Sequence, residues 1–256
     1  MENTRMENYT ISESYELPSG AQIYDAKFSP RIELRSMTAR DEMKRLNPTS
    51  TPLKTLADII ENCMIEKTPV HVYDMAVGDY EFLLHKLRTV TYGPEYQISV
   101  GCPHCQARVD STAKLDEIEV KAFNIDEFEA LRTFTLPVSN HTVRLNFQTP
   151  RLLDMIENKA KELRRRTPNA DINFETYAQL LLMIDTVDEK KMSSVDLDYF
   201  INELPAKDMA KIINQADKLN VYIGLDNILH VDCPACGGEI TTFFRFGSEF
   251  FRPTNI

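Results

Sequence analysis

The sequence lacks tryptophan, any apolar run long enough to cross a membrane, and any apolar segment near its beginning. A membrane-spanning helix needs roughly 18 consecutive apolar residues, so we expect no membrane span. The opening residues, MENTRMENYTISESYE, do not resemble a secretory signal peptide. We therefore expect a protein that is made and used in reducing, cytosol-like conditions. The 256 residues are otherwise of ordinary globular composition, with 43% hydrophobic and 27% charged side chains.

Recognisable catalytic motifs are also lacking. The sequence contains no glycine-rich phosphate loop, no HExxH motif and no G-x-S-x-G motif. Two acidic pairs, Asp185/Asp188 and Asp196/Asp198, stand at helix spacing or in a loop, and we interpret them as solvated caps and linkers. The sequence therefore predicts a protein that is not an enzyme.

Positive charge is scarce, because 29 lysines and arginines face 39 acidic residues and give a formal net charge of −10. The phosphate backbone of a nucleic acid repels such a chain unless a local basic patch compensates. One basic cluster stands out, KAKELRRR at residues 159–166, and it is interleaved with acidic residues and has no aromatic neighbours. Since cations are favoured in the last turn of a helix, we interpret it as a solvated helix end and expect no nucleic-acid binding.

Hydrophobic periodicity and turn residues divide the chain into four regions. Residues 1–30 are predicted to form a polar N-terminal arm, and residues 31–115 an N-terminal α/β part with a first cysteine motif. Residues 116–228 are predicted to form a β-hairpin plus a helical insertion, and residues 229–256 a second cysteine motif with an aromatic C-terminal tail. Helices are predicted over 39–46 (with Thr38 as its cap), 53–65, 77–93, 150–166, 174–187, 194–204 and 205–219, and a hairpin over 134–150.

Four of the five cysteines form two similar motifs, CPHC at Cys102 and Cys105 and CPAC at Cys233 and Cys236. Each lies between two runs of β-type residues, so each predicts a two-cysteine turn at the tip of a hairpin. Two such tips facing one another supply four sulfurs, the closed shell of a structural Zn²⁺ site. Gly237 and Gly238 suit a tight turn after the second motif, whereas Gln106 and Ala107 make the first a less ideal copy.

Other readings of these cysteines stay open. A thioredoxin-like redox dithiol is disfavoured because two matching motifs occur without a βαβ context, while an iron–sulfur cluster would use the same four thiolates. His104 and His230 lie beside the motifs, and we expect both to point away from a site already filled by sulfur. Cys63 falls on the apolar face of the helix predicted over 53–65, so we interpret it as a small buried hydrophobe.

The predicted fold is therefore α+β, a split β-hairpin zinc ribbon with an N-terminal α/β part and a mostly α-helical insertion between its two knuckles. The inner cysteines are separated by 127 residues, and closing so long a loop costs on the order of 4 kcal/mol of chain entropy. We expect the metal to form a clasp at the base of the insertion, after the insertion has folded.

Beyond the cysteines, the sequence resembles the T4-type bacteriophage baseplate hub and hub-assembly proteins. The resemblance covers about four-fifths of the chain, through IELRSMTARDEM, LHKLRTVTYGPEYQISVGCPHC and LDNILHVDCPACGGEITTFFRFGSEFFRP. Its most specific elements are the closing FFRP and the run of Leu87, Arg88, Tyr92, Gly93 and Tyr96.

The resemblance implies a structural or assembly component of the baseplate hub of a contractile phage tail. It would be made in the host cytoplasm, be located in the virion tail, and contact other hub or tail proteins, with self-association in a symmetric assembly as a further expectation. A cellular zinc-ribbon module that binds protein or nucleic acid is the alternative, and an enzyme with structural zinc comes last.

The aromatic tail has two readings. Its phenylalanines either pack into the core around the second knuckle or form a docking surface for a partner. On the second reading the partner-binding residues are Phe244, Phe246, Phe250, Phe251 and Arg252.

Overall fold

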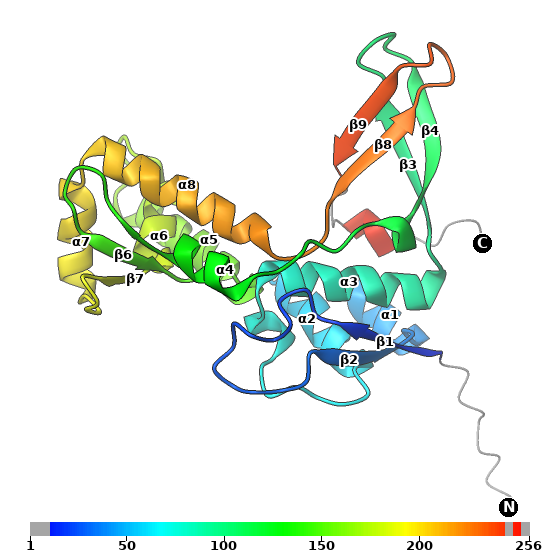
Figure 1. Ribbon diagram of the computed structural model, residues 1–256, viewed down its shortest axis with the longest axis horizontal. Coiled ribbons are helices and arrows are strands. Elements are labelled where there is room, and N and C mark those ends of the chain that lie inside the picture. The colour runs from blue at the N-terminus through cyan, green and yellow to red at the C-terminus, as the bar shows by residue number, and fades with distance from the viewer. Residues whose placement is uncertain (1–10, 244–247, 252–256) are drawn as a thin grey trace, which may run out of the picture.

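The computed structural model describes residues 11–243 and 248–251 and contains helices with small antiparallel sheets, in agreement with the predicted α+β class. We divide it into a body (residues 11–94 and 248–251), an insertion (115–227) and an arm (95–114 and 228–243). In Figure 1 the body lies at the bottom, the insertion extends to the left, and the arm rises to the top right. One continuous hydrophobic core runs through body and insertion, whereas the arm has a small core of its own.

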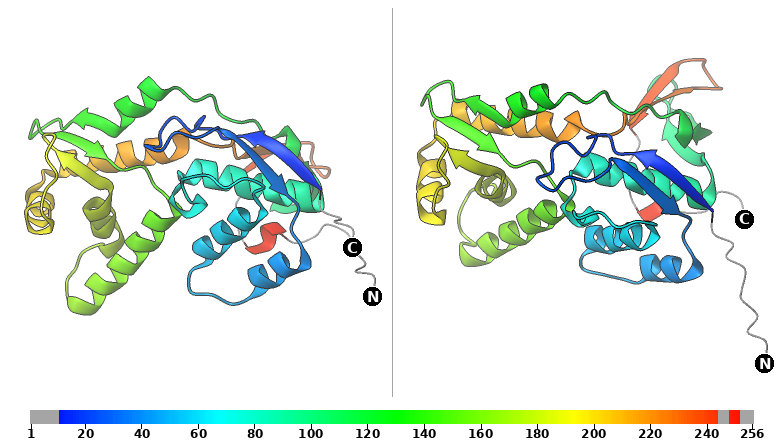
Figure 2. Two further views of the ribbon diagram at one scale, coloured as in Figure 1. Left: turned by 90° about the horizontal axis from the view of Figure 1, so that it is seen from below. Right: turned by 60° about the horizontal axis from the view of Figure 1, so that its bottom comes forward.

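The body is built around helix α3 (Val77–Tyr92), which carries ten buried residues. Strand β1 (Ser12–Glu16) pairs antiparallel with β2 (Arg31–Arg35), and α1 (Ala39–Leu46), α2 (Pro52–Cys63) and the 3-10 helix η1 (Val72–Asp74) complete it. The predicted helices over 39–46, 53–65 and 77–93 are confirmed to within a residue or two. Figure 2 shows how these elements gather around α3 from two further directions.

The prediction that residues 1–30 form a polar N-terminal extension is wrong for residues 11–30. Residues 1–10 lie outside the described part of the chain. Beyond β1, the side chains of Leu17, Ser19 and Tyr24 are buried. The Ser19 hydroxyl and the Tyr24 hydroxyl each donate to Oδ2 of Asp79 on α3, at 2.5 and 2.6 Å. This segment therefore belongs to the body, because a buried carboxylate recruits its polar groups as hydrogen-bond partners.

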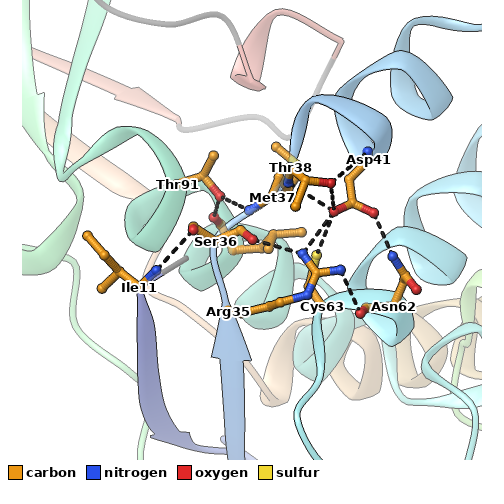
Figure 3. A network of polar contacts seen from close by, with 10 residues as sticks. Ile11, Arg35, Ser36, Met37, Thr38, Asp41, Asn62, Cys63 and Thr91 are labelled. Atoms are coloured by element: carbon orange, nitrogen blue, oxygen red, sulfur yellow. Dashed lines mark hydrogen bonds and ion pairs between the residues drawn. The ribbon is translucent and has the colours of Figure 1, made fainter. Parts of the chain in front are cut away.

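A second polar network fixes α1 to its neighbours (Figure 3). Thr38 and Asp41 form the predicted capping box at the start of α1. Asp41 also accepts from Arg35 Nη1 at 2.9 Å and from the Asn62 amide at 2.6 Å, so it links β2, α1 and α2. The Cys63 thiol lies 3.9 Å from the same carboxylate and is completely buried, as expected for a small hydrophobe.

The insertion combines five helices with a three-stranded antiparallel sheet in the order β5-β6-β7. Its sheet contains the predicted hairpin, because β5 and β6 are joined by a turn with Asn140 at positive φ. Two features differ from the expectation: α4 was not predicted, and the helix expected over 174–187 ends at Met183, where β7 begins. The elements are η2 (Leu115–Glu117), α4 (Ile125–Arg132), β5 (Thr133–Thr135), β6 (Thr142–Leu145), α5 (Pro150–Arg166), α6 (Phe174–Met183), β7 (Ile184–Val187), α7 (Ser194–Glu203) and α8 (Ala206–Tyr222).

The two chain segments that enter and leave the insertion run side by side across α3. The Lys121 amide donates to the Gly224 carbonyl at 2.9 Å, and the Asp226 amide donates to the Glu119 carbonyl at 2.8 Å. Gly224 in turn approaches the backbone of Gly78 on α3 so closely that a Cβ on Gly78 would lie 2.2 Å from the Ile223 carbonyl oxygen. Glycine is therefore required at position 78 by a close approach of two backbones.

The arm consists of two separate hairpins. Strand β3 (Glu95–Gly101) pairs with β4 (Arg108–Lys114), and β8 (Ile228–Asp232) pairs with β9 (Glu239–Phe243), all antiparallel. Figure 1 shows both hairpins rising from the body with their turns at the far end. The cysteine turns thus lie at the outer tip of the arm, which corrects our expectation of a clasp at the base of the insertion.

Candidate metal centre

The two cysteine turns have the same backbone hydrogen bonds. In the first, the Cys102 amide donates to the Ala107 carbonyl and the Gln106 amide donates to the Cys102 carbonyl, both at 2.9 Å. In the second, the Cys233 amide donates to the Gly238 carbonyl at 2.9 Å and the Gly237 amide to the Cys233 carbonyl at 2.8 Å. The sequence similarity of the two motifs therefore reflects one turn geometry that the chain forms twice.

That geometry places the residue after the second cysteine in the left-handed region. Gly237 has φ +70° and Gln106 has φ +63°. Glycine adopts this conformation without penalty, whereas a side chain such as glutamine does so at a cost of order 1 kcal/mol. The first turn is thus the strained copy, as its sequence suggested.

The four sulfur atoms converge at the tip of the arm. Sγ of Cys102 lies 3.7 Å from Sγ of Cys236, Sγ of Cys105 lies 3.7 Å from Sγ of Cys233, and all four lie within 4.8 Å of one another. None forms a disulfide. With a Zn–S bond of about 2.3 Å, a tetrahedron of four sulfurs has edges of about 3.8 Å. The separations therefore fit a single metal ion, and these cysteines are the one group of metal-ligating type found among the described residues.

The pKa values of the Cys102 and Cys236 thiols are shifted in opposite directions. Amides of Cys105 and His104 point at Cys102 and lower the pKa of its thiol to about 6. The Gly238 amide lowers the pKa of Cys236, but the neighbouring thiols of Cys105 and Cys233 outweigh it and raise that pKa to about 12. A divalent cation removes this competition, because a coordinated thiol is deprotonated outright.

The two histidines near the turns are not part of the sulfur cluster. The His104 ring packs over the second turn, where its Nε2 lies 3.2 Å from the Glu239 carbonyl oxygen and a Cβ on Gly238 would lie 2.6 Å from its Cδ2. His230 pairs instead with the Glu239 carboxylate at 2.6 Å. The expectation that both stay outside the sulfur shell is confirmed. The stacking of His104 on Gly238 adds a second reason for the glycine pair, which sequence reasoning assigned to turn flexibility alone.

Two residues of the aromatic tail that we assigned to partner binding are instead part of the chain's own core. Phe250 and Phe251 belong to the 3-10 helix η3 (Ser248–Phe251), and both rings are buried in the core of the body. This corrects their assignment as partner-binding residues, because burial within the chain's own core removes them from a partner's reach. Phe244, Phe246 and Arg252, which complete that hypothesis, lie outside the described residues.

The resemblance motif and the tail meet at Arg88, whose role was not evident from the sequence. Its side chain is buried and donates from Nε to the Phe250 carbonyl at 3.2 Å and from Nη2 to the Glu95 carbonyl at 2.7 Å, and from Nη1 to the Gly93 carbonyl. Its guanidinium carbon also lies 5.4 Å from the Tyr96 ring centre and 5.9 Å from that of Phe250. Arg88 of this motif therefore joins α3, the start of the arm and η3 through its hydrogen bonds.

The remaining candidates have structural explanations. The basic cluster at the end of α5 forms ion pairs with Glu157, Glu162 and Glu175, which confirms a solvated helix end. Asp188 pairs with His141 and accepts from the Thr142 amide, while the Asp196 amide donates to the hydroxyl of Ser193, the residue that caps α7. Among the described residues no helix is both long and apolar enough to cross a membrane.

The site is a cluster of four cysteines whose sulfur atoms lie close enough together to hold a metal ion. The chain belongs to the family described as T4 bacteriophage base plate protein, whose family model matches residues 8–252. A phage baseplate protein is a component of the virion tail and works beside other tail proteins. Neither the curated proteins nor the solved structures contain a match to this chain.

Proposed function

We propose that the chain is a structural or assembly component of the baseplate hub in a contractile phage tail, acting through protein–protein contacts rather than as an enzyme. The observation that carries this proposal is the family match, which extends over nearly the whole chain. The arm and the insertion leave the body in different directions (Figure 1). Such a shape exposes several faces to neighbours, as a part of a multi-protein assembly requires.

We further propose that Cys102, Cys105, Cys233 and Cys236 hold one structural Zn²⁺. Four thiolates leave no open position for a substrate or water, so the ion would join the hairpins and stabilise them. The sulfur separations of at most 4.8 Å favour a single ion. In an iron–sulfur cluster the four thiolates are divided among two or four iron atoms, so they cannot all lie around one metal position. Elemental analysis of the purified protein tests this, with one zinc per chain expected, and with iron or no metal contradicting it.

Infection with a phage in which this gene is disrupted tests the hub role. Without the protein, we expect baseplates to stop at a stage that lacks the hub, and a plasmid copy of the gene to restore tails. A complete hub surrounded by defective outer parts would contradict the hub assignment. Mass spectrometry of purified virions then separates the two forms of the proposal, since a structural component remains in the particle and an assembly factor does not.

A further inference from the structure

Helix α7 is apolar on two sides, although only one of them faces the core. Leu197 and Ile201 are buried within the insertion. Val195 and Tyr199, one helical turn apart on another side, have 75% and 69% of their surface exposed. These are the two most exposed large apolar side chains in the described part of the chain. A helix with apolar residues outside its core-facing stripe is expected to bury them against another element or a partner.

The exposed side of α7 borders a hollow. Its volume is about 590 Å³, and its apolar wall is formed by Met192, Val195, Tyr199, Phe200 and Leu204, which we call the α7 face. The hollow is completed by the turn at Ser139 and His141 and by Pro205 at the start of α8. Apolar surface gathered in this way, rather than scattered, is typical of a protein interaction site.

The charges at the α7 face are of one sign. Asp196 and Glu203 line the hollow, and no lysine or arginine does. His141, which also lines the hollow, is paired with Asp188 at 2.7 Å. α7 itself carries three acidic residues and no basic one. The electrostatic complement of such a surface is an apolar segment with basic residues beside it.

The position of α7 keeps this surface open. In Figure 1 the helix stands at the far end of the insertion, and both views in Figure 2 also place it at that outer end. A partner seated there meets neither the arm nor the body.

We propose that the α7 face docks an amphipathic helix with basic flanks from another protein, which covers Val195 and Tyr199 while its lysines or arginines meet Asp196 and Glu203. This goes beyond the hub role, since it names one contact surface and the chemistry of its partner. It does not depend on which tail protein supplies the helix.

A binding experiment with the full chain tests this directly. The probe is a synthetic leucine–lysine peptide of about 14 residues, roughly four helical turns, titrated with detection by calorimetry and by NMR amide shifts. Two control peptides are a scrambled one of equal composition, which has the charge without an apolar face, and a leucine–glutamate version. We expect the leucine–lysine peptide to bind and to shift amides of α7, and both controls to bind at least about tenfold more weakly.

Matched variants assign the binding to α7. Val195→Ser with Tyr199→Ser removes the apolar contacts without changing charge, and both side chains are exposed, so folding is retained. We expect an affinity loss of about tenfold or more, whereas Val221→Ser, an equally simple change of an exposed valine on α8, leaves affinity unchanged. Glu203→Gln should cost about two- to threefold at low salt and nothing at high salt. Its control is Glu66→Gln, which changes an exposed carboxylate between α2 and η1 in the body.

Equal binding by the wild type and the Val195→Ser/Tyr199→Ser variant would overturn the proposal. So would a loss of the same size in Val221→Ser, or binding of the scrambled peptide as tight as that of the amphipathic one. The infection experiment reads the hub role separately, because it uses the whole gene and not this surface.

Discussion

Arg88 and Phe250 are 162 residues apart in sequence, yet the guanidinium of one donates to the backbone carbonyl of the other. The same guanidinium holds carbonyls of Gly93 and Glu95 at the start of the arm. A planar group with five donors can serve three acceptors at once, which an ammonium group cannot do with the same geometry. This residue therefore fixes both the origin of the arm and the position of η3.

Replacing Arg88 by lysine should lower the free energy of unfolding by about 2–4 kcal/mol, because buried carbonyl groups lose their donor. Urea unfolding measures the effect, and hydrogen exchange should show the greatest loss of protection at residues 248–251 and 93–96. Arg108→Lys on the exposed side of the arm is the control, with a change within about 0.5 kcal/mol. Equal losses of unfolding free energy in Arg88→Lys and Arg108→Lys would show that the buried hydrogen bonds of Arg88 do not stabilise the fold more than an exposed arginine does.

Gly78→Ala should be among the most damaging of small substitutions. The added Cβ would lie 2.2 Å from the Ile223 carbonyl oxygen and 2.5 Å from its carbon. Both are backbone atoms, so the segment leaving the insertion must move away from α3. We expect a loss of about 2–4 kcal/mol in thermal or urea unfolding.

Gly101→Ala provides the comparison for Gly78→Ala. A Cβ there meets no atom within 4 Å, and Gly101 is not among the residues with positive φ. We expect stability within about 0.5 kcal/mol of the wild type. If Gly78→Ala were equally neutral, the close approach of the two backbones would not require glycine at position 78.

Local sequence signals predicted much of this fold, and the reason is visible in particular residues. The starts of α1, α5 and α7 coincide with side-chain caps at Thr38, Thr149 and Ser193, which act within one helical turn. Cysteine spacing likewise identified the four cysteines whose sulfurs converge, because each turn supplies its two sulfurs locally.

What could not be predicted depends on distant partners. Residues 184–187 continue an apolar helical pattern, but they become β7 by pairing with β6, where Val187 stands opposite Val143. From the sequence, Ser19 and Tyr24 belong to a polar N-terminal segment. In the structure they are buried and donate hydrogen bonds to Asp79, some 60 residues later. The place of the cysteine cluster at the tip of the arm depends on how both hairpins leave the body, which no local pattern encodes.

Asp41 should make the stability of the body sensitive to acid. Burial raises the pKa of this carboxyl, but hydrogen bonds from Arg35, Thr38 and Asn62 outweigh that effect and lower the pKa to about 2. Because the folded pKa lies below the unfolded value of about 3.9, the stabilisation is fully present above that value. It is lost as the pH falls through about 2.

Urea unfolding between pH 5 and pH 2 measures this contribution, which should be on the order of 2 kcal/mol. Asp41→Asn should be less stable than the wild type at pH 5 and approach it at low pH. Asp110→Asn, in an exposed pair on the arm, should run parallel to the wild type throughout. A constant difference between Asp41→Asn and the wild type would mean that the loss reflects packing and not ionisation.

Removal of the metal should unfold the arm and leave the rest of the fold in place. An isolated two-stranded hairpin is marginally stable in water, and the core between the two hairpins holds only five buried residues, two of them the proposed ligands Cys102 and Cys233. Nearer the body, β4 and β8 are separated by a hollow of about 410 Å³. The hairpins thus meet chiefly around the sulfur cluster, whereas α3 and the insertion share a separate, continuous core.

Cys105→Ser tests this with little change in packing, since Cys105 is exposed. We expect loss of the bound metal and faster hydrogen exchange in residues 95–114 and 228–243, and unchanged protection in α3 and α5. Cys63→Ala is the control, because it should keep one metal per chain although it loses a buried side chain. If Cys105→Ser instead exposed α3 and α5 to exchange as well, the arm would be a required part of the main fold. The metal would then act as a determinant of folding for the whole chain.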